Sequence, residues 1–253
     1  MATPLLSIIT VTYNAADTLR PTLESVARQT CTDYEHLIVD GASTDDTLKI
    51  AIEAGTERTR ITSERDNGIY DAMNRGMGLA KGSYLIFLNA GDSFHDNKTL
   101  QHFADSIHKH DMPGIVYGQT VLVTGGDRQV TGPRHLTAPK KLTLKSFADG
   151  MLVCHQAMAV LKRIAGPYDL RYRLSADYDW VIRCLQHSRH NVYLDEVVID
   201  YLDEGMTTRN HKASLVERFK IMCRYYGTVS TIGRHFKFAA RHLQRRITTN
   251  SKQ

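Results

Sequence analysis

The chain has 253 residues, of which 42% are hydrophobic, and its formal net charge is +5 at a pI near 9.0. This length and apolar content fit one α/β domain with a terminal elaboration and exclude a largely disordered chain. No apolar run approaches the ~20 residues that span a bilayer, and the N-terminus lacks a signal-peptide pattern, so we expect a cytoplasmic protein. The four cysteines lack Cys-x-x-Cys spacing, which favours reduced thiols over a zinc site or a disulfide framework.

The excess positive charge is concentrated at the C-terminus. From Arg209 onward the sequence has eleven basic residues and a single acid, Glu217. Such a balance favours an anionic partner, which the charge alone leaves open between nucleic acid, phospholipid headgroups and a phosphate-bearing substrate.

The first hundred residues alternate between strand and helix patterns. Apolar or β-branched runs at Leu5–Val11, Tyr34–Val39, Arg60–Ser63 and from Tyr84 predict four strands. Helical stretches follow the first three, from Asp17 or Thr18 to about Gln29, from about Asp45 to Ala54, and from Ile69 to Ala80. This alternation predicts right-handed βαβ crossovers and a mainly parallel sheet.

The remainder of the chain has a less regular pattern. We expect a helix near Lys98–His110, a strand at Ile115–Gln119, a hairpin over Val121–Val130 and a loop over Pro133–Lys145. An apolar run at Cys154–Leu161, a helix beginning near Asp177–Asp179 and a strand at Val192–Tyr201 then follow.

Polar loops follow the predicted parallel strands at their carboxyl ends. Thr12–Asn14 follows the first strand, Asp40–Asp46 the second, Asp66–Gly68 the third, and Asn89–Asp92 the fourth. Ligands of open α/β sheets bind at this edge, so Asp92 is placed to hold a metal or a polar ligand. The alternative is that Asp92 is an ordinary turn residue. Asp177 also has an alternative role, because acids commonly cap helix starts.

With these motifs in place, the chain resembles family 2 glycosyltransferases of the GT-A fold over roughly Leu5–Tyr201. Ser7–Asn14 is similar to the first strand of that family, Asp40–Asp45 to its nucleotide loop, and Asn89–Asp92 to its metal turn. Ser63–Gly76, His155-Gln156 and Ala176–Asp179 resemble the branch of colanic-acid and O-antigen polysaccharide biosynthesis.

The resemblance implies an α/β GT-A fold with a mainly parallel central sheet flanked by helices. Residues 1–204 would form the transferase domain, with a nucleotide-sugar half at 1–96 and an acceptor half at 97–204. Residues 205–253 would form a basic helical extension. The implied activity is inverting transfer of a hexosyl or deoxyhexosyl group from a nucleotide-diphosphate donor to a saccharide acceptor, expected to be lipid-linked.

Each requirement of such a donor has a candidate residue. Tyr13 offers a ring face, Asp40 an acceptor for a base edge, Asp66 a contact from the adjoining loop, and Asp92 a ligand for Mg²⁺ or Mn²⁺. By resemblance, Asp177 is the general base. The expected donor-binding residues are Thr12, Tyr13, Asn14, Asp40, Gly41, Ser43, Asp66, Asp71, Asn89, Ala90 and Gly91.

The expected metal turn departs from the family pattern, which has two or three acids. This chain has Asn89 and Gly91 at the corresponding places, so only Asp92 supplies a carboxylate. The reduced turn keeps a non-catalytic sugar or nucleotide binder open as an alternative. A nucleotidyltransferase lacks support because no glycine-rich, lysine-bearing phosphate loop follows the first strand. Nucleic-acid binding lacks a recognisable module, and we expect no nucleic-acid partner.

The C-terminal segment predicts a basic amphipathic helix. Apolar residues recur at helical spacing while basic residues occupy much of the remaining surface. The apolar set is Ile232, Phe236, Ala239, Ala240, Leu243 and Ile247, and the basic set is Arg234, Lys237, Arg241 and Arg245. This helix would lie on an anionic membrane surface, making the protein peripheral on the inner face of the plasma membrane, or would pack on the catalytic domain or on a second subunit of a homodimer.

Overall fold

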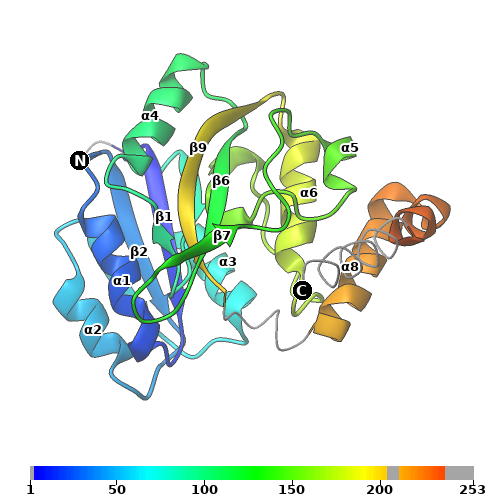
Figure 1. Ribbon diagram of the computed structural model, residues 1–253. Coiled ribbons are helices and arrows are strands. Elements are labelled where there is room, and N and C mark those ends of the chain that lie inside the picture. The colour runs from blue at the N-terminus through cyan, green and yellow to red at the C-terminus, as the bar shows by residue number, and fades with distance from the viewer. Residues whose placement is uncertain (1–2, 204–210, 237–253) are drawn as a thin grey trace, which may run out of the picture.

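A computed structural model describes residues 3–203 and 211–236 of the chain (Figure 1). Within these residues, nine strands form a single sheet in the order β3-β2-β1-β4-β8-β6-β9-β5, and β7 pairs with β6 outside this path. Helices flank the sheet, which curls as it passes from the N-terminal to the C-terminal half. The expected α/β class with a C-terminal helical extension is confirmed.

The N-terminal half contains the predicted strand and helix alternation. Its elements are β1 (Leu6–Thr12), α1 (Ala16–Ala27), β2 (Tyr34–Asp40), α2 (Thr47–Ala54), β3 (Thr59–Ser63), α3 (Ile69–Leu79) and β4 (Tyr84–Phe87). The four strands are parallel, with Leu6 of β1 paired with both Tyr34 and Tyr84. Because parallel strands end at the same sheet edge, their four polar loops gather there as predicted.

The second half completes the sheet mainly through antiparallel pairs. Its elements are β5 (Ser93–Phe94), α4 (Thr99–Lys109), β6 (Ile115–Val123), β7 (Val130–Pro133), α5 (Leu144–Phe147), η1 (His155–Ala157), β8 (Met158–Leu161), η2 (Lys162–Ile164), α6 (Ala176–His187), β9 (Asn191–Leu202) and α8 (His211–Tyr226). Strand β8 runs antiparallel to both β4 and β6, while β6 and β9 are parallel. The parallel arrangement is therefore confined mainly to the N-terminal half, and the sheet as a whole is mixed.

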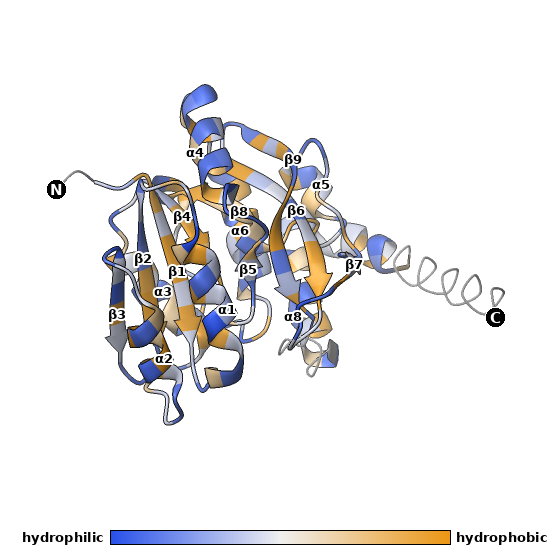
Figure 2. Cartoon of the chain, turned by 60° about the vertical axis from the view of Figure 1, so that its left-hand side comes forward, coloured by the Kyte–Doolittle hydropathy of each residue, from blue (hydrophilic) through white to orange (hydrophobic). Residues whose placement is uncertain are grey.

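The core is continuous from the sheet into α6 (Figure 2). Strand β4 is buried along its whole length, as its uninterrupted apolar sequence predicts. Phe87 packs edge-to-face on Trp180 of α6, with ring centroids 5.5 Å apart, and Trp180 stacks on Tyr168 at 5.0 Å. Aromatic contacts of this kind fix α6 against the end of β4.

Helix α8 packs beside α6 and is hydrogen-bonded to the chain just before it (Figure 1). The Glu217 carboxylate accepts the backbone N–H groups of Arg173 and Leu174, each at 2.9 Å. Ser175 Oγ lies 3.1 Å from Ser214 Oγ in the same contact. The first part of the C-terminal extension is therefore joined to the loop that leads into α6.

A helical segment at residues 228–236 follows α8. Thr231 is buried and Arg234 pairs with Asp149, whereas Ile232 is 44% exposed and Phe236 is 73% exposed. The other members of the predicted amphipathic stripe, from Lys237 to Ile247, lie outside the described residues. None of the described helices is long and apolar enough to cross a membrane.

The packing of α3 on β1 generates a stability prediction from two glycines of one helix. A Cβ at Gly76 would lie 2.5 Å from Ile9 Cγ2 in the core, whereas a Cβ at exposed Gly78 would meet no atom within 4 Å. We expect Gly76→Ala to lower the free energy of unfolding by about 1–3 kcal/mol through overpacking. The matched Gly78→Ala should raise it by up to about 1 kcal/mol through helix propensity. Urea denaturation measures both, and a Gly76→Ala protein as stable as Gly78→Ala would contradict this packing.

Candidate active site

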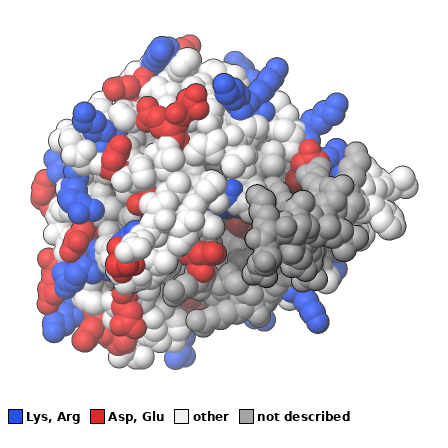
Figure 3. All heavy atoms as spheres, in the orientation of Figure 1, with Lys and Arg blue, Asp and Glu red and all other residues white. Residues whose placement is uncertain are grey.

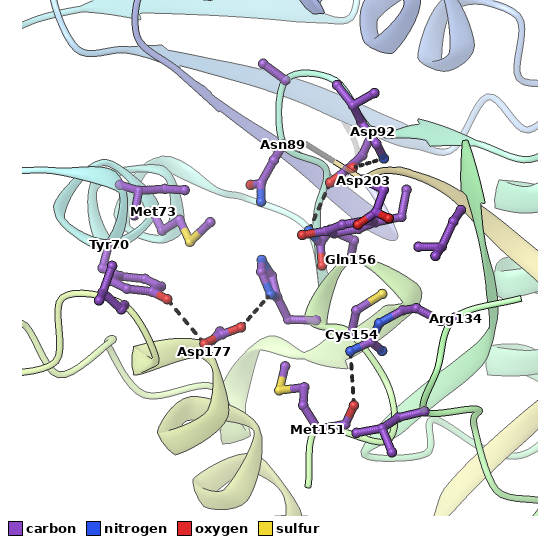
Figure 4. A pocket seen from close by; sticks show the side chains of 18 of the residues that line it. Tyr70, Met73, Asn89, Asp92, Arg134, Met151, Cys154, Gln156, Asp177 and Asp203 are labelled. Carbon is purple, nitrogen blue, oxygen red and sulfur yellow. Dashed lines mark hydrogen bonds and ion pairs between the residues drawn. The ribbon is translucent and has the colours of Figure 1, made fainter. Parts of the chain in front are cut away.

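A cavity of ≈ 750 Å³ lies between the two halves of the molecule. Its walls come from the β4–β5 turn, the start of α3, η1, the start of α6, the end of β9 and α8. Asp92 and Asp177, predicted from sequence as metal ligand and general base, both line it (Figure 4). The fold therefore brings together two carboxylates that are 85 positions apart in the chain.

The Asp92 carboxylate is buried at 4% exposure and accepts two hydrogen bonds. Gln156 Nε2 donates to Oδ2 at 2.9 Å, and the backbone N–H of Leu202 donates to Oδ1 at 3.1 Å. Burial raises the pKa of Asp92 to about 6, against a smaller lowering effect of these donors and of the nearby His155 and Arg128. The group is thus an ionised but poorly solvated carboxylate near neutral pH, which a cation would stabilise.

The turn that presents Asp92 is tightly constrained. Gly91 has φ +99°, and a Cβ there would lie 2.8 Å from Leu202 Cδ2, so glycine is required on both conformational and steric grounds. Thr22 of α1 accepts the Gly91 N–H at 3.0 Å and donates to the Asp92 carbonyl at 2.6 Å. Arg128 from the β6–β7 turn donates to the Gly91 carbonyl at 2.9 Å.

The residues at the turn fit a hard divalent cation. Asn89 Oδ1 is buried and has no hydrogen-bond partner among the described residues, so an oxygen ligand is available beside Asp92. In the described part of the chain, no three His, Cys, Asp or Glu side chains gather as a metal site. Asp92 and Asn89 would therefore hold Mg²⁺ or Mn²⁺ together with oxygens of a bound substrate.

Three strand-exit loops interlock at the same sheet edge. Asn14 donates its N–H to Ser43 Oγ at 2.9 Å, and its Oδ1 accepts the Thr44 N–H at 2.9 Å. A Cβ at Gly41 would lie 2.5 Å from Asp66 Oδ2 and 3.3 Å from Tyr13 Cδ2. Tyr13, Gly41 and Asp66 are thus neighbours, with the Tyr13 ring 62% exposed and free to stack on a ligand.

Asp40 is the predicted donor-binding residue whose environment differs most from expectation. Its carboxylate is fully buried and accepts hydrogen bonds from Ser43 N–H at 3.0 Å, Ser43 Oγ at 2.5 Å and Ser63 Oγ at 2.6 Å. These three donors use most, but not all, of the acceptor capacity of the carboxylate. Asp40 organises the loop that follows β2, and its predicted contact with a donor base stays a prediction; Asp66 is the more accessible carboxylate beside Tyr13.

The other predicted donor residues divide between ligand-facing and supporting positions. Asn89 and Ala90 line the cavity. The Thr12 Oγ1 hydroxyl is buried without a hydrogen-bond partner among the described residues, at the edge where β1 ends. Asp71 accepts the backbone N–H of Asn67 at 3.0 Å and lines a second, smaller cavity of ≈ 390 Å³ next to the main one.

Asp177 lies in the first turn of α6, and its side chain remains 18% exposed toward the cavity. The Tyr70 hydroxyl donates to Oδ1 at 3.2 Å, and His155 Nδ1 lies 3.6 Å from Oδ2. Burial by itself would raise the pKa of Asp177, but His155 and Arg218 outweigh it and hold that pKa below its ordinary value. An ionised, oriented carboxylate at the cavity wall can accept a proton.

Neighbouring Asp179 has a structural environment. It is fully buried, pairs with Arg183 Nε at 2.8 Å and accepts the Tyr225 hydroxyl at 2.8 Å. These contacts tie α6 to α8 and leave Asp179 without access to the cavity. Of the two adjacent acids, the structure therefore favours Asp177 as the functional one.

Several cavity residues were not predicted as site residues. Gln156 holds Asp92, His155 and Tyr70 face Asp177, and Arg134, Arg173, Arg218 and Asp203 line the walls. Figure 4 shows Gln156 beside Asp92 and Tyr70 beside Asp177. His155-Gln156 was visible in the sequence as a family-like dipeptide. The arginines come from loops and from α8, where no sequence motif marks them.

The buried charge of Asp92 generates a pH-dependent prediction. Its folded pKa of about 6 lies above the ordinary 3.8, so its ionisation destabilises the fold above pH 6, and this cost is relieved as the pH falls toward 4. Asp92→Asn removes the cost, so its stability relative to the parent should be about 2 kcal/mol more favourable at pH 7.5 than at pH 4.5.

Urea unfolding of both proteins in chelator at the two pH values measures this difference. Contributions of all other titrating groups are shared and cancel. A stability difference that is independent of pH would show that Asp92 is not a strained buried carboxylate.

Comparison with known proteins identifies the family. The family model described as glycosyl transferase family 2 matches residues 7–165. A PGL/p-HBAD biosynthesis glycosyltransferase of Mycobacterium tuberculosis (strain ATCC 25177 / H37Ra) is 41% identical over 212 residues, covering 81% of this chain and 79% of that protein.

Solved structures show the same fold at low sequence identity. Staphylococcus aureus TarS 1–349 in complex with UDP-GlcNAc has a TM-score of 0.71 at 16% identity and covers 92% of this chain and 73% of its own. The mannosyltransferase PcManGT of Pyrobaculum calidifontis, in complex with GDP-Man and Mn²⁺, has a TM-score of 0.66 at 17% identity, covering 94% and 75%. By its matched motifs, fold and relatives, the chain belongs to glycosyl transferase family 2.

Proposed function

We propose that this glycosyltransferase moves a hexosyl or deoxyhexosyl group from a nucleoside-diphosphate donor to a saccharide acceptor with inversion at the anomeric carbon. The observation that carries the proposal is the single cavity lined by Asp92 on the strand-exit side and Asp177 at the start of α6. Asp92 would bind a cation that neutralises the leaving diphosphate. Asp177 would accept the proton of the attacking hydroxyl. Residues 1–96 bind the donor, and residues 97–204 bind the acceptor and provide the base.

The donor lies along the carboxyl ends of the parallel strands. The nucleoside stacks on exposed Tyr13 and contacts Asp66, because these residues flank the closely packed Gly41. The diphosphate reaches the β4–β5 turn, where Asp92 and Asn89 would supply oxygen ligands to Mg²⁺ or Mn²⁺. A bound cation would supply the counter-charge for the departing diphosphate.

Transfer is a single displacement. The acceptor oxygen forms a bond to the anomeric carbon as the bond from that carbon to the diphosphate oxygen breaks, and the bonding pair leaves with the nucleoside diphosphate. Asp177 Oδ accepts the hydroxyl proton, while Tyr70 and His155 hold its carboxylate in place. Attack from the face opposite the leaving group inverts the anomeric configuration.

The donor and acceptor identities follow from different evidence. Structural neighbours bind UDP-GlcNAc and GDP-Man, so UDP- and GDP-sugars are the first donors to test. The family resemblance points to bacterial surface polysaccharide, including the O-antigen type, and to a lipid-linked acceptor. The curated relative instead carries the name PGL/p-HBAD biosynthesis, so both acceptor classes belong in the screen.

Product formation separates this function from its alternatives. A non-catalytic binder would bind a nucleotide sugar without releasing nucleoside diphosphate, and a nucleotidyltransferase would release diphosphate from a nucleoside triphosphate. Mass spectrometry of reactions with nucleotide sugars, Mn²⁺ and acceptors identifies which product forms. A glycosylated acceptor plus free nucleoside diphosphate is the expected result.

The proton-acceptor role of Asp177 is tested by an isosteric change. Asp177→Asn keeps the size and the capping ability, so donor affinity should stay nearly unchanged while the transfer rate falls by about two to four decades. The matched Asp179→Asn removes a buried ion-pair partner and should lower stability with a much smaller loss of transfer at low temperature. Near wild-type transfer by Asp177→Asn would show that Asp177 is not the proton acceptor.

We further propose that the C-terminal helix docks the protein on an anionic membrane surface. Val229, Ile232 and Phe236 are spaced along one face of the helical segment at residues 228–236, with exposures of 87%, 44% and 73%. On the left of the face shown in Figure 3, basic and acidic side chains are interspersed. In the sequence, the excess of positive charge lies from Arg209 onward. An exposed apolar face next to basic residues suits insertion among anionic headgroups.

Vesicle sedimentation tests the docking. The full-length protein should co-sediment with vesicles containing anionic lipid, and added salt should weaken this binding because near-surface basic residues contribute roughly 1 kcal/mol each. Truncation after Gly227 should abolish binding without stopping donor hydrolysis. Phe236→Ser should weaken it, while Ile52→Ser, at an exposed apolar site on α2, should not. Equal sedimentation of the full-length and truncated proteins would sink the membrane role and favour packing on a second subunit.

A further inference from the structure

Three arginines that line the cavity, Arg134, Arg173 and Arg218, form no ion pair with any described residue. Eight other arginines do pair with carboxylates: Arg20, Arg58, Arg60, Arg75, Arg171, Arg183, Arg224 and Arg234. The arginines that line this cavity thus differ from these eight, because no described carboxylate neutralises them. Two of the three, Arg173 and Arg218, lie at the two sides of one contact between chain segments.

That contact is the attachment of α8 to the loop before α6. Glu217 accepts the backbone N–H groups of Arg173 and Leu174 at 2.9 Å, so its chain neighbour Arg218 is held near the same loop. Asp177 follows Arg173 by four positions in the first turn of α6. The contact thus sets two cationic side chains at the wall of the cavity that carries the proton acceptor.

Arg218 is incompletely satisfied in this position. Its Nε is buried and has no hydrogen-bond partner among residues 3–203 and 211–236. A desolvated donor on a charged group is costly to leave unpaired, so a ligand oxygen is the expected partner. Arg218 also lowers the pKa of Asp177, which places its charge close to the base. The proposed function assigns the diphosphate of the donor to a different wall, the β4–β5 turn with Asp92 and Asn89.

We propose that Arg173 and Arg218 form a second anion site, on the base side of the cavity, which binds a phosphate group carried by the acceptor. The paired N–H donors of a guanidinium match phosphate oxygens, and two such groups can neutralise a phosphate dianion. The site rests on the proposed transferase function and specifies its acceptor as a phosphorylated molecule. Because the anion is held beside Asp177, it orients the acceptor hydroxyl toward the base.

Binding of hexyl phosphate in the presence of chelator tests this site directly. In chelator the proposed cation site at Asp92 cannot form, so titration calorimetry reports anion binding that needs no metal. Hexyl phosphate should bind, hexanol should not, and inorganic phosphate will show whether the headgroup alone suffices. Arg218→Gln and Arg173→Gln should each weaken hexyl phosphate at least tenfold. Arg189→Gln, at an exposed position after α6, should leave its affinity unchanged.

Binding of UDP and GDP with Mn²⁺ separates this site from the donor site. The two cavity variants should keep nucleoside diphosphate affinity within about twofold of the parent, and thermal melts show whether they are folded. If Arg218→Gln and Arg173→Gln lose the nucleoside diphosphate and not hexyl phosphate, these arginines serve the donor and the proposal is overturned. Equal hexyl phosphate affinity in all four proteins would also overturn it. Failure of the parent to bind UDP or GDP would instead count against the proposed function.

Discussion

The hydrogen bonds that the Asp92 carboxylate accepts join the two halves of the molecule. Asp92 lies in the turn after the buried strand β4. Its two carboxylate oxygens accept hydrogen bonds from Gln156 of η1 and from the backbone N–H of Leu202 at the end of β9. The same turn packs closely on β9, because a Cβ at Gly91 would lie 2.8 Å from Leu202 Cδ2. This one side chain thus links the turn after β4 to η1 and to the end of β9, three elements that line the cavity.

Electrostatics gives the two carboxylates of this cavity different states. Burial raises the pKa of Asp92 to about 6, whereas His155 and Arg218 hold the pKa of Asp177 below its ordinary value. Asp92 is therefore a carboxylate that gains from a cation, and Asp177 is one that remains ionised and ready to take a proton. The side chains that lower the pKa of Asp177 belong to η1 and α8, so the C-terminal extension contributes to the electrostatics of the cavity as well as to any surface that the chain contacts.

Sequence reasoning predicted the parts of this structure that depend on local pattern. The strands and helices of the N-terminal half follow hydrophobic periodicity, and the turn at Asn89–Asp92 follows from an apolar run that stops at a polar, glycine-containing turn. Sequence reasoning could not predict that the Asp40 carboxylate accepts hydrogen bonds from both Ser43 and Ser63. The Ser63 contact depends on the register between β2 and β3. Sequence reasoning also could not predict that arginines line the cavity, because Arg218 reaches it only through the packing of α8 on the loop before α6.

The central claim is that Asp92 and Asn89 form a cation site completed by the diphosphate of the donor. Electron paramagnetic resonance of Mn²⁺ titrated into the protein, with and without UDP or GDP, measures it most directly. We predict weak Mn²⁺ binding to the protein alone, tight binding when the nucleoside diphosphate is present, and loss of the tight site in Asp92→Ala with the fold intact. Nucleoside diphosphate binding that is equally tight in excess chelator, or unchanged in Asp92→Ala, would contradict the account.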